Sequence, residues 1–174
     1  MTTLKPMLLA LGTLLAACSG SGVHDAAVPR QNGVECEGGS VHGDAELARY
    51  AACVTIKGDL DVTSVSTLAP LRELETVHGM LTIRKTDRLY SLSGLERLHR
   101  VEGLSIEENR SLISIGSLNT LAHAERVSIV LNPRLTSTQG FMNGLSRATS
   151  RITVVGNAGL RAEGVASSMR VSVL

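Results

Sequence analysis

Three histidines recur at similar intervals along the chain, and imidazoles are common ligands for zinc and related metals. His78, His99 and His123 lie 21 and 24 residues apart, so a metal site would need the fold to make them converge. Glu107 and Glu108 are adjacent, but neighbouring side chains on a strand point to opposite faces, which is wrong for a catalytic carboxylate pair. The chain has no His-Glu-x-x-His, no phosphate loop and no Gly-x-Ser-x-Gly outside the Ser/Gly-rich residues near its start. We therefore assign no catalytic residue, metal ligand or cofactor, and we predict that the chain is not an enzyme.

The first cysteine, Cys18, ends a run of twelve apolar or small residues, MLLALGTLLAAC, and Lys5 is the one charge before it. Twelve helical residues span about 18 Å, which is short of the ~30 Å of a bilayer core. The pattern is typical of a secretory signal. Residues 15–18, LAAC, resemble the bacterial lipobox, in which a signal peptidase cuts before a lipid-modified cysteine. We expect a signal peptide at residues 1–17 and a lipid on Cys18, with an ordinary signal peptide as the alternative.

Residues 18–33 are rich in Gly, Ser and Pro and offer almost nothing to bury. We therefore expect a flexible lipidated tether there, followed by a folded domain at residues 34–174. Ser19 occupies the position at which an aspartate retains some lipoproteins in the inner membrane. The sequence thus favours a cell-envelope protein of the outer membrane or cell surface over one of the inner membrane.

Cys36 and Cys53 remain as an even pair in an exported chain, and we predict a disulfide between them. Its loop of about 17 residues would contribute roughly 3 kcal/mol of stability in the chain-entropy model. Between the two cysteines, residues 45–52 are predicted to form a short helix with Asp44 as its N-cap. A helix held by a disulfide at this end would act as a lid on the domain.

The charge and the aromatic content exclude one class of partner. The chain has 17 basic and 16 acidic residues, a formal net charge of +1, and 2% aromatic residues. It therefore has no excess charge to neutralise phosphates and few rings on which bases could stack. We expect no nucleic-acid partner.

Short alternating apolar segments recur through the rest of the chain and predict the fold class. They begin 21, 23, 23, 25 and 19 residues apart, which is regular and too short for a crossover that contains a full helix. We predict a mainly β solenoid, a parallel β-helix of about six rungs with one strand in each. The segments are residues 60–62, 81–83, 104–106, 127–129, 152–154 and 171–173.

A turn with an asparagine follows three of these segments, at Asn109, Asn132 and Asn157, and Thr86 takes that place in an earlier repeat. An asparagine side chain can bond neighbouring backbone groups, so stacked asparagines could satisfy turns that face inward. After the turns, leucines and other aliphatic residues recur every third residue. We expect these stretches to return the chain in short helical or irregular form, and the stacked rungs to share one core.

The repeat resembles the receptor L domain family, which is known from the insulin and epidermal growth factor receptors and from exported proteins. Its motif is apolar-x-Gly-x-Leu-x-Ile, then Asn-x-x-Leu-x-x-Leu, and parts of it appear at residues 56–62, 77–83 and 106–112. The likeness covers about residues 36–160. It implies a right-handed solenoid of parallel strands with an N-terminal disulfide-linked capping helix, and a binding or structural role. An ordinary leucine-rich repeat is the nearest alternative, although its turn is one residue tighter.

The outward positions of the predicted strands form a candidate binding face, on which Arg84 and Glu107 could pair across strands. We expect a non-catalytic, lipid-anchored module of the cell envelope that contacts a protein or a glycan through this face. The alternative is a structural envelope component that packs on copies of itself. The candidate face comprises Thr82, Arg84, Ser105, Glu107, Ser128, Val130, Thr153 and Val155.

Overall fold

The computed structural model describes residues 33–138, 140–141, 145 and 151–160. These residues belong to a compact unit that spans Gln31–Leu174. The expected signal peptide, Cys18, the tether up to residue 32 and the expected strand at residues 171–173 lie outside the described residues.

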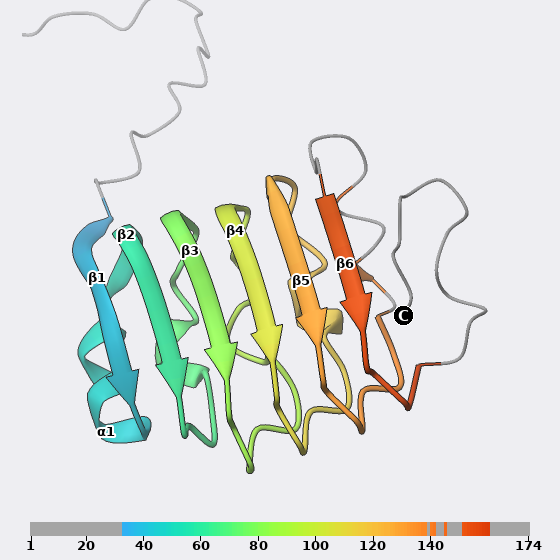
Figure 1. Cartoon of the computed structure of the whole chain (residues 1–174). Coiled ribbons are helices and arrows are strands. Elements are labelled where there is room, and N and C mark those ends of the chain that lie inside the picture. The colour runs from blue at the N-terminus through green and yellow to red at the C-terminus, as the bar shows by residue number, and fades with distance from the viewer. Residues whose placement is uncertain (1–32, 139, 142–144, 146–150, 161–174) are drawn as a thin grey trace, which may run out of the picture. The chain divides into compact units, whose positions relative to one another are not determined.

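Six parallel strands form one sheet, and they lie side by side in the order in which they occur in the chain (Figure 1). All five neighbouring pairs are parallel. The sheet therefore has β1 at one edge and β6 at the other among the described strands. The strands are β1 (Val34–His42), β2 (Cys53–Thr63), β3 (Thr76–Arg84), β4 (Arg100–Glu107), β5 (Arg126–Val130) and β6 (Arg151–Val155).

The register places equivalent residues of successive repeats in line. Leu81 on β3 pairs with Leu60 on β2 and with Leu104 on β4, and all three are buried. Since neighbouring strands lie about 4.8 Å apart, aliphatic side chains of successive repeats stack directly on one another. The predicted mainly β fold with parallel stacked strands is confirmed for the described part of the chain.

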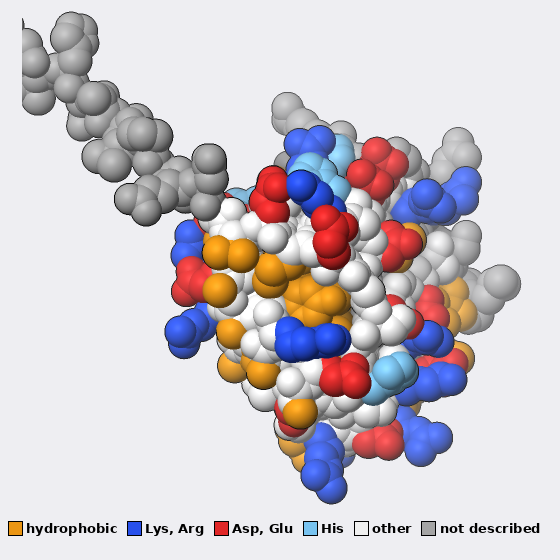
Figure 2. Space-filling view, turned by 90° about the vertical axis from the view of Figure 1, so that its left-hand side faces the viewer, with side chains coloured by type: hydrophobic (Ala, Val, Ile, Leu, Met, Phe, Trp, Pro, Cys, Tyr) orange, Lys and Arg blue, Asp and Glu red, His pale blue; other side chains and the backbone are white. Residues whose placement is uncertain are grey.

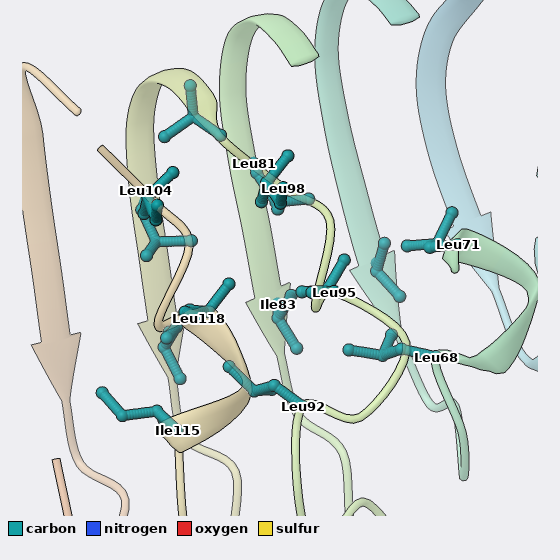
Figure 3. Close-up of a cluster of buried hydrophobic side chains, with 14 of the residues drawn as sticks. Leu68, Leu71, Leu81, Ile83, Leu92, Leu95, Leu98, Leu104, Ile115 and Leu118 are labelled. Atoms are coloured by element: carbon teal, nitrogen blue, oxygen red, sulfur yellow. The ribbon is translucent and has the colours of Figure 1, made fainter. Parts of the chain in front are cut away.

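The return segments cover one face of the sheet with rows of aliphatic side chains, as Figure 3 shows. Among the described residues they contain single 3-10 turns at η2 (Ala69–Leu71) and η3 (Gly116–Leu118), and isolated parallel β-bridges join Ser91 to Ser114 and Ser114 to Ser137. A three-residue spacing suits such turns, because a 3-10 helix has three residues per turn and keeps every third side chain on the same side. The buried residues of these segments are Leu68, Leu71, Leu74, Leu92, Leu95, Leu98, Ile115, Leu118 and Leu121.

The start of the domain differs from the prediction in two ways. β1 is a strand that the alternation of apolar residues did not indicate. The expected helix at residues 45–52 is shorter, with α1 (Asp44–Leu47) continuing into the 3-10 turn η1 (Ala48–Tyr50). Gly43 occupies the N-cap, so the prediction that Asp44 caps the helix was wrong. Leu47 and Tyr50 enter the core, and no helix of the described residues is long and apolar enough to cross a membrane.

Cys36 on β1 and Cys53 on β2 form a disulfide, which confirms the predicted pairing. It joins the edge strand to its neighbour across 17 residues of sequence, and the two Cα atoms lie 5.8 Å apart. The short α1–η1 segment lies within this loop. The disulfide therefore fixes the edge strand to the sheet at the start of the domain.

Each strand is followed directly by a residue with positive φ, so the chain turns in the same way at every repeat. Glycine provides this conformation at the first and last positions, where φ is 84° and 68°. The four residues between them are not glycine and have φ of 53° to 57°. Such backbone costs an L-residue about 1–2 kcal/mol, and the stacked turns hold it in place. The residues are Gly43, Ser64, Lys85, Glu108, Leu131 and Gly156.

Candidate functional site

The face of the sheet opposite the return segments carries the outward residues of every strand. Strand side chains alternate between the two faces, so burial of the aliphatic residues leaves the residues between them on the outside. The pairing aligns these outward residues in two rows across the sheet. The first row is Asp61, Thr82, Ser105, Ser128 and Thr153, and the second is Thr63, Arg84, Glu107, Val130 and Val155.

The end of this face towards β2 and β3 is held by an ion pair. Arg84 donates from Nε to Oδ1 of Asp61 at 3.1 Å and from Nη2 to Oδ2 at 2.6 Å. These hydrogen bonds to the carboxylate raise the pKa of Arg84. The expected partner, Glu107, instead accepts a hydrogen bond from the hydroxyl of Ser105. The predicted pairing of Arg84 with the directly opposite Glu107 was therefore wrong, and a bidentate pair with Asp61, which lies diagonally across on β2, takes its place.

Thr63 belongs to the second row by register but is not available at the surface. Its hydroxyl donates to the carbonyl of Val41 at 3.0 Å and lies 2.6 Å from Nδ1 of His42 on β1. Only 7% of Thr63 is exposed. Ser105, in the first row, is also only 7% exposed, so this predicted member of the binding face is not available at the surface either. The accessible part of the face therefore begins at the Asp61–Arg84 pair and does not include Ser105.

The end of the face towards β5 and β6 is apolar and carries hydroxyl groups. Val130 lies opposite Val155, and Ser128 lies opposite Thr153. All four are partly exposed. This end presents a row of hydroxyls beside a row of aliphatic side chains, on two strands held in fixed register.

Sequence reasoning missed two residues on the same face. Arg126 and Arg151 begin β5 and β6, lie opposite one another and are exposed. Each precedes the hydroxyl residue of its strand by two positions, so each shares the outward face with it. Extending the alternation of outward residues back by two positions from Ser128 and Thr153 would have found these arginines.

The predicted turn asparagines form a hydrogen-bonded ladder within the corner that follows the strands. Nδ2 of Asn109 donates to the carbonyl of Ile83 at 2.9 Å, and the amide N–H and Nδ2 of Asn109 both donate to Oδ1 of Asn132 at 3.1 Å. Asn132 repeats this arrangement with the carbonyl of Ile106 at 2.9 Å and with Oδ1 of Asn157 at 3.0 and 3.1 Å. Asn109 and Asn132 are fully buried. They therefore hold the turns in place and are not accessible to a ligand.

Thr86 takes the place of asparagine at the first position of this ladder. Its hydroxyl and its amide N–H donate to Oδ1 of Asn109 at 2.6 and 3.2 Å. The equivalent residue one repeat earlier, Val65, is apolar and buried. The threonine thus ends the polar ladder, because it donates to Oδ1 of Asn109, the last acceptor. An asparagine at this position would leave its own side-chain amide facing the apolar turn of Val65.

A surface hollow of about 240 Å³ lies at the first corners, where the asparagine ladder is absent. The amide N–H and the hydroxyl of Ser66 donate to the Asp44 carboxylate at 2.8 and 2.5 Å. These hydrogen bonds hold the pKa of Asp44 below its ordinary value. The carboxylate is therefore already engaged, and the described lining of the hollow includes neither His nor Cys. The lining residues are Asp44, Ser64, Val65, Ser66, Lys85, Asp87 and Arg88.

The three histidines do not share one position in the repeat. His78 lies on β3, paired with Lys57 of β2. His99 and His123 occupy corners before the next strands, where the amide N–H of His123 donates to the carbonyl of His99. Within the described ranges no three His, Cys, Asp or Glu residues are grouped so that they could hold a metal ion.

The β1 end of the sheet is a second surface that could meet a partner. Figure 2 faces this end and shows apolar side chains near its centre with charged side chains around them. The β1–β2 register is interrupted between Val34 and Glu35 and between Glu37 and Gly39. Bulged edges of this kind resist pairing with a further strand. The regular outer face of the sheet is therefore the stronger candidate site.

Comparison with known proteins agrees with this fold. The receptor L domain profile matches residues 52–145, more than half of the chain. No curated protein and no solved structure is detectably similar to the chain. The matched region runs from the start of β2 through Asn109 and Asn132 to the return segment after β5. With this match and its parallel stacked repeats, the chain belongs to the receptor L domain family.

Proposed function

We propose that the chain is a non-catalytic binding module that contacts a protein or glycan partner through the outer face of its sheet. The observation that carries the proposal is the shared register of β2 to β6 from Leu60, Leu81 and Leu104 onwards, which aligns the outward residues in rows. The register shift between Val77 and Met80 of β3 lies before this part of the sheet. A surface built on regular strands keeps its side chains in fixed positions, and this lowers the entropy lost on binding.

A photo-crosslinking amino acid placed on this face tests the proposal. Ser128 on β5 is the test position, and Asn119, exposed beside η3 on the return side, is the matched control. Both variants are expressed in the full chain and irradiated in cells. We expect a discrete crosslinked species from position 128 and none from position 119. Equal crosslinking from both positions, or none from 128, would contradict a binding role for the sheet face.

We also propose that a lipid on Cys18 attaches the module to the cell envelope, at the outer membrane or cell surface. Residues 15–18 and the apolar run before them support this proposal. Metabolic labelling with a fatty-acid analogue should label the wild type and not Cys18→Ala. Membrane fractionation of the labelled cells then reports which membrane holds the protein. An unlabelled wild type would refute the anchor.

A structural component that packs on copies of itself would use the same face differently. Sedimentation of a soluble form that begins after residue 18 separates the two roles. The binding module should remain a monomer at micromolar concentration, whereas a self-associating component should form dimers or larger assemblies.

A further inference from the structure

Two arginines on the outer face lie directly opposite one another, and neither has an acidic partner among the residues that the structure describes. Arg126 and Arg151 are paired in the β5–β6 register, about 4.8 Å apart along the sheet. Neither side chain forms an ion pair or a hydrogen bond within the described part of the chain. By contrast, Arg84 binds Asp61, and Arg97 binds two glutamates.

The surroundings leave this pair open on the outer face. The next residue in the same row is Gly103 on β4, which has no side chain. Met80 of β3 covers it, because a Cβ at this glycine would lie 2.6 Å from the Met80 methyl carbon. Glu125, which precedes Arg126, and Glu102 on β4 are both exposed, and neither forms an ion pair with either arginine within the described residues.

Like charges opposite each other on adjacent strands are unfavourable. An anion placed between two guanidinium groups removes this repulsion, and the planar fork of arginine binds carboxylates through two parallel hydrogen bonds. The charge arrangement therefore favours an anionic group on the partner.

The neighbouring rows narrow the chemistry of that partner. Ser128 and Thr153 follow the arginines by two residues, and Val130 and Val155 follow by four. At about 3.3 Å per residue, the arginines and the valines are about 13 Å apart. A partner that fits both rows has a carboxylate and an aliphatic group at this separation, with polar groups between them.

This combination favours a protein partner over an acidic polysaccharide. A polysaccharide of acidic sugars presents no aliphatic side chain to the valines. The aromatic rings on which sugars usually stack are also missing from the described sheet face, because Tyr50 and Phe141 are buried and Tyr90 lies on a corner after β3.

Resting on the proposed binding role of the face, we propose that the outer surface of β5 and β6 docks an acidic segment of a partner protein. Arg126 and Arg151 bind its carboxylate. Ser128 and Thr153 contact its polar backbone groups, and the two valines pack against an aliphatic side chain.

The test measures how the arginines affect crosslinking from Thr153 in the full chain. The variants are Arg126→Gln with Arg151→Gln, and the matched control is Arg110→Gln, an exposed arginine outside the sheet face. We expect the double variant to lower the yield of the crosslinked species at least tenfold and the control to change it less than twofold. Raising the salt from 0.05 to 0.5 M should also lower the wild-type yield, because screening weakens exposed charge pairs. Protease should degrade the partner portion of the crosslinked species.

The outcomes separate this inference from the proposed function. If the double variant crosslinks from the face as strongly as the wild type, the role of the arginines is overturned and the binding role of the face stays intact. A crosslinked species that contains a polysaccharide or a lipid would overturn the protein partner. Absence of crosslinking from every face position would remove both proposals.

Folding of the double variant is checked by thermal melting. The variant should melt at the same temperature as the wild type or higher, because the substitution removes a repulsion. A clear fall in melting temperature would show that the arginines serve the fold, and would overturn the inference.

Discussion

Asn132 offers the sharpest test of how the stacked turns are held together. Its side chain is fully buried and joins the turn to both neighbouring repeats. Replacing Asn132 by Leu keeps the approximate volume and removes every polar contact of the side chain. The substitution therefore tests the hydrogen bonds of the ladder more than its packing.

The expected cost follows from the groups that lose a partner. The buried amide N–H of Asn109 loses its acceptor, and the carbonyl of Ile106 loses the Nδ2 donor. Each backbone group left unsatisfied costs about 1–3 kcal/mol, so Asn132→Leu should lower the free energy of unfolding by about 2–6 kcal/mol. That is a large part of the roughly 5–15 kcal/mol typical of a folded domain.

Urea unfolding followed by circular dichroism, with the disulfide intact, measures this loss. Asn119→Leu is the control, because Asn119 is exposed and no hydrogen bond of its side chain is seen within the described chain. It should change the stability by less than about 0.5 kcal/mol. If Asn132→Leu cost no more than Asn119→Leu, the ladder would not be the element that fixes the turns.

Three further predictions concern the backbone, the disulfide and pH. Gly94→Ala should lower the free energy of unfolding by more than about 2 kcal/mol, because the φ of Gly94 is 112° and a Cβ there would lie 2.1 Å from a backbone oxygen. At Gly58 a Cβ meets no atom within 4 Å, so Gly58→Ala should cost only about 1 kcal/mol of backbone strain. Equal melting temperatures for the two variants would contradict this prediction. Reducing the Cys36–Cys53 disulfide should lower the free energy of unfolding by about 3 kcal/mol, and urea titrations with and without reductant measure the difference. The pKa of Asp44 is lowered in the folded protein, so its stabilising effect is present above the unfolded value of about 3.9 and is lost as the pH falls through the folded value. Asp44→Asn should therefore lose less stability than the wild type between about pH 5 and pH 2, and a parallel loss in both proteins would argue against this role.

The repeat could be predicted from the sequence because its signals are local. Alternating apolar residues at intervals of 21 to 25 residues define β2 to β6, and the structure places these strands in one sheet with equivalent residues in register. The three-residue spacing of leucines defines the return segments, which form 3-10 or irregular structure. The cysteine pairing was predicted because Cys36 and Cys53 are the two cysteines that remain once Cys18 is assigned to a lipid.

β1 could not be predicted in the same way. Its sequence, VECEGGSVH, contains two adjacent glycines and little apolar alternation. It becomes a strand because β2 offers an unpaired edge and the disulfide holds the two strands together. Hydrogen bonding to a neighbouring strand here outweighs a weak intrinsic preference.

The sequence by itself determined the repeat, the direction in which the strands stack and the residues that fill the core, since periodicity decides which side chains share a face. Only the tertiary structure decided which polar side chains meet. Arg84 binds Asp61 in place of Glu107, Asp44 binds Ser66 in place of capping its helix, and Arg126 lies opposite Arg151. Such contacts depend on side-chain direction and on residues 20 or more positions away in the sequence. A shift of the strand register by one position would place a different residue opposite, and an opposite charge could be replaced by a like charge.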